Sequence, residues 1–191
     1  MIKKINSSYF DTLLGTAELV VYKESKNNDN LYHYAIIFGK IEDKNNVFCR
    51  VHSACITSEI FMAINCDCRE QFWEGLKLAK QQNGLVIYLQ QEGRGNGIEA
   101  KIMQMKLENT SKIDTIDAFK KCGFPIDNRS YDTAADILND LKIKSIQLLT
   151  ANPDKIKQLE ELGIKIAKRI HPNIKIEHKL ALRNLKAKQK N

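Results

Sequence analysis

Three cysteines, Cys55, Cys66 and Cys68, constrain this chain more than any other feature of its sequence. Cys66 and Cys68 are too close together for an easy disulfide, but at a turn or a strand end both thiolates can point at one ion, with Cys55 as a third ligand. Zinc prefers sulfur and nitrogen donors in a tetrahedron, and three protein ligands leave the fourth position for water, the arrangement of catalytic zinc sites. Such a water is acidified toward neutral pH and becomes a usable nucleophile. The C-x10-C-x-C spacing therefore predicts a zinc site.

Two other interpretations of this motif stay open. Free cysteines are commonly buried as small apolar residues, with no metal involved. His52 precedes Cys55 by three residues and could be a fourth ligand, which would close the site to water. The spacing alone does not decide between an open and a closed site.

Size and composition indicate one globular, soluble domain. The chain has 191 residues, of which 43% are hydrophobic and 28% charged, and this is enough material for a sizeable core. The longest apolar runs, such as 85–89, are far too short to cross a bilayer, and the N-terminus does not lead into a signal-peptide core. Five cysteines without a framework spacing favour the reducing cytoplasm.

The net charge of +7 favours an anionic partner, which could be a nucleotide, a nucleic acid or an acidic lipid surface. Part of this charge lies in residues 176–191, which we interpret as a basic C-terminal tail. Terminal runs of this kind are most often a solvated helix face or a frayed end. The charge alone therefore names no ligand.

The first half of the chain is predicted to form an antiparallel meander that leads into the cysteine segment. Short β-rich runs at 18–22, 34–38 and 47–51 are separated by Asn-rich turns. A helical pattern then covers 69–82, and a buried strand covers 85–89.

The second half alternates helices and strands, which predicts a largely parallel sheet covered by helices. The expected helices are 98–108, 114–121, 131–141 and 153–162, and the expected strands are 145–149 and 164–167. The whole chain is thus predicted to be a single-domain α/β protein with a mixed sheet and helices on both faces. Ligands of such sheets bind at the carboxyl ends of strands, where we expect the loops 92–97, 127–129 and 150–155.

A glycine-rich loop, residues 90–97, joins the strand at 85–89 to the following helix. Strand, glycine-rich loop and helix can offer backbone N–H groups to a phosphate. The lysine of a Walker loop is absent, and a simple turn with flexible φ angles is an equally good interpretation of the loop alone.

Together these motifs resemble the GTP cyclohydrolase II family, from about residue 15 to about residue 169. The resemblance is carried by landmarks in the same order as in the family: Arg50-Val51-His52-Ser53, Cys55, Cys66-Asp67-Cys68, Gln71, Gln91-Glu92-Gly93-Arg94-Gly95, Asp114-Thr115, Gly123-Phe124-Pro125, Asp127, Arg129, Leu148-Leu149-Thr150, Asn152-Pro153 and Lys155.

The resemblance implies a fold, an activity and a site. The activity is zinc-dependent opening of the imidazole ring of GTP with release of diphosphate, as in the first step of riboflavin biosynthesis. Cys55, Cys66 and Cys68 would bind zinc, Asp127 would accept a proton, and Arg129 would act as nucleophile on the α-phosphate. The substrate-binding positions, which would hold GTP or a related purine nucleotide with magnesium on its phosphates, are Arg50, Val51, His52, Ser53, Ala54, Gln71, Glu92, Gly93, Arg94, Thr115, Thr150 and Lys155.

The expected assembly is a homodimer in the cytoplasm with no membrane partner, and a nucleic-acid partner is not favoured. The family-like domain would cover residues 1–175 and the basic tail residues 176–191. A capping pair before the helix at 131–141 is an alternative role for Asp127 and Arg129.

Several departures from the family pattern lie near the expected chemistry. Ala54 replaces a glutamate beside the zinc ligand Cys55, and Met105 replaces an active-site tyrosine. Arg69, Asn96, Phe119 and the C-terminal tail also differ from the family. Two alternatives to GTP hydrolysis follow: a divergent enzyme that retains the formyl group or acts on another nucleotide, and an inactive zinc-containing protein that binds nucleotides or RNA.

Overall fold

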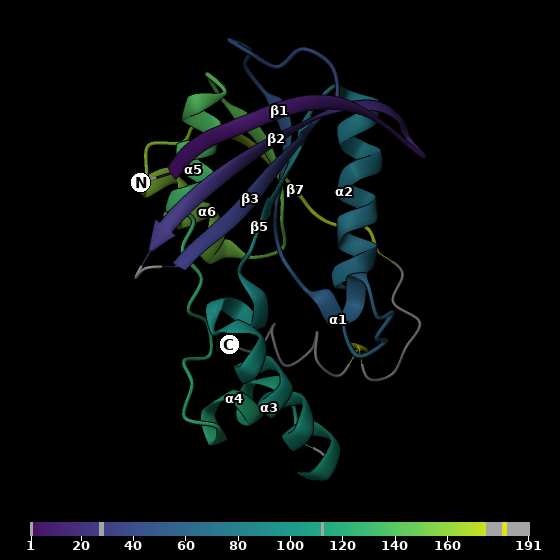
Figure 1. The fold of residues 1–191 in the computed structure, drawn as a ribbon, viewed down its shortest axis with the longest axis vertical. Helices are drawn as coiled ribbons and strands as arrows, with labels where there is room; N and C mark the ends of the chain where they lie inside the picture. The colour runs from purple at the N-terminus through teal and green to yellow at the C-terminus, as the bar shows by residue number, and fades with distance from the viewer. Residues whose placement is uncertain (1, 27–28, 112, 175–180, 183–191) are drawn as a thin grey trace. The chain divides into compact units, whose positions relative to one another are not determined.

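The computed structural model describes residues 2–26, 29–111, 113–174 and 181–182. Within these ranges seven strands form one sheet in the order β1-β2-β3-β5-β4-β6-β7 (Figure 1). The strands are β1 (Ile2–Thr12), β2 (Gly15–Lys26), β3 (Asp29–Ile37), β4 (Val47–Ser53), β5 (Leu85–Leu89), β6 (Ile146–Leu149) and β7 (Ile166–Ile170).

The sheet is mixed, which confirms the predicted fold class. Strand β1 pairs antiparallel with β2, β2 with β3, and β3 with β5. Strand β6 pairs parallel with β4 on one side and with β7 on the other. The expectation of parallel strands in the second half is confirmed, because β6 pairs parallel with both β4 and β7. The buried strand β5 instead pairs antiparallel with β3 through its Leu85–Tyr88 segment. An apolar run predicts a buried strand but carries no information on the direction of its neighbour.

Helices cover both faces of the sheet (Figure 1). On one face α2 (Cys68–Gln82) packs through Phe72, Leu76 and Ala79 on Phe48 and neighbouring strand residues. On the other face α5 (Asp132–Asp140) and α6 (Pro153–Glu161) cover the larger core cluster. Alternate residues of one strand supply the two cores, because successive side chains of a strand point to opposite faces.

The N-terminal strand β1 was missed in the sequence. Residues 3–11 are all exposed, so this edge strand has no buried stripe that hydrophobic alternation could reveal. The last strand also lies slightly later than expected, at Ile166–Ile170. By contrast, Asn152 caps α6 by accepting a hydrogen bond from the Asp154 N–H at 2.9 Å, with Pro153 in the first turn, as predicted.

A buried histidine joins β3 to its neighbours. His33 is 1% exposed, and its Nδ1 accepts a hydrogen bond from the Gln90 N–H at 3.1 Å. Its Nε2 lies 3.2 Å from the Glu24 carboxylate. Burial lowers the pKa of His33, and the nearby Glu24 only partly opposes this. A proton on Nδ1 would also face the Gln90 N–H, so the neutral ring is the form that fits.

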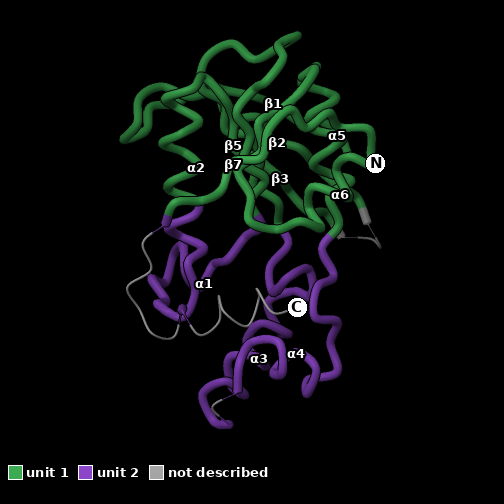
Figure 2. Tube along the Cα trace, turned by 180° about the vertical axis from the view of Figure 1, so that it is seen from behind, with its two compact units in different colours: residues 1–52, 72–90, 130–173 green, residues 53–71, 91–129, 174–191 purple. Residues whose placement is uncertain are grey.

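The chain forms two compact units (Figure 2). Unit 1, residues 1–52, 72–90 and 130–173, contains almost all of the sheet with most of α2, and α5 and α6. Unit 2 comprises residues 53–71, 91–129 and 174–191. Its elements are α1 (Ile56–Glu59), the 3-10 helix η1 (Glu92–Gly95), α3 (Gly97–Ser111) and α4 (Thr115–Lys121).

The predicted limits of the domain and the tail stay a prediction. Of the proposed tail, 176–191, only residues 181 and 182 lie within the described part of the chain. Among the helices that the structure describes, none has the length and apolar character needed to cross a membrane.

Candidate active site

The three cysteines of the opening motif converge in unit 2. Their Sγ atoms all lie within 4.8 Å of one another, and those of Cys55 and Cys66 are 3.8 Å apart. Cys55 lies just before α1 and Cys68 begins α2, so the two helix starts and the intervening loop carry the thiols. Hydrogen bonds from the Cys55 and Cys68 thiols lower the pKa of Cys66 well below its usual range.

The donor set fits zinc. Two sulfur ligands on one tetrahedral zinc, each about 2.3 Å from the metal, lie roughly 3.8 Å apart, which matches the Cys55–Cys66 separation of 3.8 Å. Cys55 is 3% exposed, so the cluster is shielded on one side. Three thiols on so small a triangle are the donors that bind a borderline-soft cation.

Hydrogen bonds hold the segments that carry the thiols. The Glu92 carboxylate accepts from the N–H of Ile56 at 2.7 Å and from the N–H of Gly93 at 2.9 Å, which ties η1 to the residue after Cys55. The Ser58 hydroxyl accepts from the Arg69 N–H at 3.2 Å. Burial raises the pKa of Glu92.

His52 does not join the cysteines in the metal-binding group found among the described residues. It is 2% exposed, and its ring lies 5.1 Å from that of Phe72 and 5.7 Å from that of Tyr88. Its Nδ1 is 3.4 Å from Nη2 of Arg50. These contacts pack His52 within unit 1, and its predicted contact with the substrate stays a prediction.

Lys101 is a residue of this cluster that sequence analysis missed. Its Nζ lies 3.7 Å from Cys55 Sγ. Burial lowers the pKa of Lys101, but attraction to the three cysteines and Glu92 outweighs it, so the pKa lies above its usual range. The lysine is far from Cys55 in sequence, and no local spacing could have indicated the contact.

The glycine-rich loop packs against the segment that carries Asp127 and Arg129. The Arg94 guanidinium donates to the Ile126 carbonyl at 2.9 Å, and the Asn128 N–H donates to the Arg94 carbonyl at 2.9 Å. At Gly95, φ is +82°, and a Cβ would lie 2.6 Å from the Asn128 carbonyl oxygen. The loop therefore supports the segment that carries Asp127 and Arg129, whether or not it also contacts phosphate.

Asp127 and Arg129 form an ion pair. Arg129 Nε donates to Asp127 Oδ1 at 2.8 Å, and its Nη2 donates to Oδ2. Burial raises the pKa of Asp127, but the hydrogen bonds and charge of Arg129 outweigh it and hold the pKa below its usual value. The carboxylate is therefore ionised at neutral pH.

Four further predicted substrate-binding positions belong to unit 2: Ser53, Ala54, Gln71 and Thr115. Thr115 is 9% exposed and its hydroxyl donates to Glu108. Gln71 donates to Asp67 at 2.6 Å, and Ser53 to Gln91 at 3.4 Å. Ala54 is buried and contributes no side-chain polar group.

The other predicted substrate positions belong to unit 1 and are buried. Arg50, Val51 and His52 lie on β4, Thr150 follows β6, and Lys155 lies on α6. Arg50 donates to the Leu149 carbonyl at 3.1 Å, and Lys155 donates to the Val51 carbonyl at 2.6 Å. Two cationic side chains are thus held near the carboxyl ends of parallel strands, where α/β sheets bind ligands.

Comparison with known proteins decides the family. A sequence model of GTP cyclohydrolase II matches residues 3–171. "GTP cyclohydrolase-2" of Picrophilus torridus is 41% identical over 171 residues, which are 89% of this chain and 87% of that protein. "GTP cyclohydrolase-2" of Buchnera aphidicola subsp. Baizongia pistaciae is 39% identical, over 88% of this chain and 84% of that protein.

The chain belongs to the GTP cyclohydrolase II family. It is therefore an enzyme of the hydrolase class, as the sequence predicted. A solved structure, the two-domain 3,4-dihydroxy-2-butanone 4-phosphate synthase RibBX from A. baumannii, is similar to 91% of this chain and is matched over 40% of its own length. Its TM-score is 0.51 at 16% identity, so it supports the fold alone.

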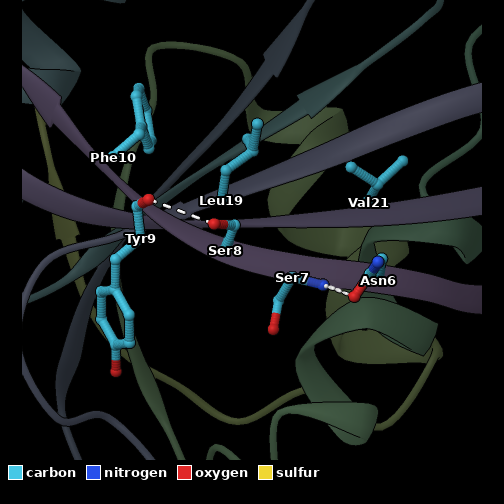
Figure 3. Close-up of a pocket in the computed structure, with 7 residues that line it drawn as sticks. All are labelled: Asn6, Ser7, Ser8, Tyr9, Phe10, Leu19 and Val21. Carbon is cyan, nitrogen blue, oxygen red and sulfur yellow. Dashed lines mark hydrogen bonds between the residues drawn. The ribbon is translucent and has the colours of Figure 1, made fainter.

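Unit 1 has two surface hollows whose lining includes none of the predicted site residues. One lies on β1 and β2, where Phe10, Leu19 and Val21 extend to one side and Tyr9 to the other (Figure 3). The second is apolar and is lined by residues of the β1–β2 hairpin, β3 and α2, including Leu13 and Trp73. The roles of the individual site residues stay predictions.

Proposed function

We propose that this chain is a zinc-dependent GTP cyclohydrolase II, which hydrolyses GTP to a ring-opened pyrimidine nucleotide, formate and diphosphate in riboflavin biosynthesis. The observation that carries the proposal is the convergence of the Cys55, Cys66 and Cys68 thiols in a chain similar to proteins named GTP cyclohydrolase-2. A relative from Endomicrobium trichonymphae, 39% identical over 88% of this chain, is named a riboflavin biosynthesis protein.

Cys55, Cys66 and Cys68 would hold the zinc ion and leave one position open. When bound, zinc supplies Lewis-acid activation of water, which attack at C8 of guanine requires. The small sulfur triangle and the Glu92 hydrogen bond to the Ile56 N–H keep this site in place. A preorganised site of this kind needs no rearrangement at the moment of reaction.

Asp127 would act as proton acceptor once its ion pair with Arg129 loosens. Both oxygens of the carboxylate accept hydrogen bonds from the guanidinium, and a carboxylate held in this way is a weak base. An arginine fork binds phosphate as well as it binds carboxylate. A nucleotide phosphate that engages Arg129 would therefore raise the proton affinity of Asp127, so that substrate binding would prepare the base.

Arg50, Lys155 and Arg94 would offset the phosphate charge, with magnesium on the same phosphates. This part of the proposal rests on the family resemblance and on the positions of Arg50 and Lys155 near strand ends. The proposal includes a homodimer in the cytoplasm. Residues 3–11 of the edge strand β1 are exposed and leave room for a second copy, and the mass of the protein in solution tests the dimer.

The test is incubation of the purified protein with GTP and Mg²⁺, with product mass, formate and diphosphate all measured. We expect a ring-opened nucleotide to accumulate together with diphosphate. Asp127→Asn, which keeps the size of the side chain, should lose turnover while it still binds GTP. Unconsumed GTP in the presence of zinc-loaded protein would contradict the proposal.

A second outcome is favoured by Met105, which is half-buried on α3. A thioether has no acidic proton, whereas the tyrosine of the family can relay one in the step that releases formate. The enzyme would then stop at the formylamino nucleotide, with diphosphate released but little formate. The ratio of formate to diphosphate distinguishes this outcome from complete hydrolysis. Met105→Tyr should raise that ratio toward one. A ratio of one in the unmodified protein would exclude this outcome.

A further inference from the structure

We infer that Lys101 is a charge-compensating and positioning residue of the three-cysteine metal site. The inference rests on the proposed function, because it takes Cys55, Cys66 and Cys68 as metal ligands. It adds a residue to that site which neither the motif spacing nor the expected substrate contacts assign. Its observations are a short distance, a charge balance and a packing contact, all within unit 2.

The distance places the ammonium group directly beside the thiols. Lys101 Nζ lies 3.7 Å from Cys55 Sγ, and the Sγ atoms of Cys66 and Cys68 lie within 4.8 Å of that sulfur. The side chain comes from the beginning of α3, an element distinct from those that carry the three cysteines. The cysteines lie at the starts of α1 and α2, so the Lys101 side chain contacts a segment that is distant from it in the sequence.

The charge balance explains what the ammonium does there. Three thiolates and one divalent cation carry a net charge of −1, and an uncompensated charge is costly in a partly buried site. A lysine ammonium restores neutrality for the cluster.

The fold holds Lys101 against the glycine-rich loop. Gly93 has a φ of +60°, and a Cβ placed there would lie 3.3 Å from Lys101 Cβ and 3.4 Å from its backbone N. The absence of a side chain at Gly93 thus lets η1 pack on the first turns of α3. Glu92, next to it, accepts hydrogen bonds from the Ile56 and Gly93 N–H groups. The lysine is therefore positioned by the same loop that is tied to the segment after Cys55.

Zinc affinity is the measurement that tests this role, because a residue that only contacts substrate would not change it. Zinc-loaded wild type, Lys101→Met, Lys101→Arg and Lys106→Met are titrated with a chromophoric chelator. Lys106 is an exposed lysine of the same helix and serves as the matched control. Replacement of residues next to metal ligands typically lowers metal affinity about 10- to 100-fold. We expect that loss for Lys101→Met, near-wild-type affinity for Lys101→Arg, and a change below about twofold for Lys106→Met.

Absorption spectra of the cobalt(II)-substituted proteins distinguish the loss of the compensating charge from the loss of a thiolate ligand. The sulfur-to-metal absorption bands of Lys101→Met should keep the wild-type position and intensity, because all three thiolates remain bound at saturating metal. Should Lys101→Met not fold, Lys101→Gln, which keeps a polar end, gives the same comparison.

Two results would overturn the inference alone: zinc affinity of Lys101→Met within twofold of wild type, or an arginine variant as weak as the methionine variant. A wild-type protein that binds no zinc would overturn the proposed function and this inference together. The outcomes therefore distinguish the two.

Discussion

Alanine at Gly95 should disturb the Asp127–Arg129 segment far more than it disturbs the rest of the fold. Gly95 has a φ of +82°, and its Cβ would lie 2.6 Å from the Asn128 carbonyl oxygen and 2.9 Å from the Arg129 N. To reach the ordinary contact distance of 3.4 Å, the two backbones must separate by about 0.8 Å. That movement would act directly on the loop that carries the ion pair.

The magnitude has two parts. A left-handed backbone costs a residue with a side chain about 1–2 kcal/mol, and overpacking adds about 1–3 kcal/mol. We therefore expect Gly95→Ala to lower the free energy of unfolding by roughly 2–5 kcal/mol. Misplacement of catalytic groups by about 1 Å can cost on the order of 100-fold in rate, so turnover should fall by about that factor.

Gly97→Ala is the matched control. Its φ is +88°, but nothing lies within 4 Å of the position that its Cβ would occupy. It should lose only the backbone part, about 1–2 kcal/mol, and keep its turnover. Denaturant unfolding and initial rates of diphosphate release measure both quantities. Equal stability losses and equal rates for the two variants would refute the close-contact argument.

Three further predictions follow from the site and the core. Cys66→Ser should lose most of its zinc, read by metal analysis, because it removes one of three ligands; full zinc occupancy would take Cys66 out of the ligand set. Arg94→Met and Lys155→Met should each weaken nucleotide binding by about 1–3 kcal/mol, measured by calorimetry, since each removes a charge-assisted contact; unchanged affinity in both would place the nucleotide elsewhere. Burial lowers the pKa of His33, so the folded state binds fewer protons than the unfolded state; the free energy of unfolding should be highest above pH 6.5 and fall as the pH drops through the lowered native pKa. His33→Gln should flatten this dependence, and an equally steep curve in that variant would assign it to other groups.

Local patterns in the sequence were sufficient for much of the site. The short separation of Cys66 and Cys68 limits how far apart their thiols can lie, so the convergence of these thiols could be predicted; the zinc ion that they would share stays a prediction. Asp127 and Arg129 are two residues apart in a loop, and their pairing follows from that proximity. The cap of α6 at Asn152 likewise depends only on neighbouring residues. In each case the interacting groups are close in the chain.

The tertiary structure decided what depends on distant segments. The β1 strand carries no buried stripe and exists because its backbone pairs with β2. The direction of β5 was set by its neighbour β3. Lys101 reaches Cys55, and Gly95 meets the Asn128 backbone, only because the chain folds these segments together. A sequence specifies spacing along the chain, whereas distances across the fold depend on how the elements pack. The sequence by itself thus determined the family, the fold class and the cysteine triad, and packing determined which charges and backbones surround that triad.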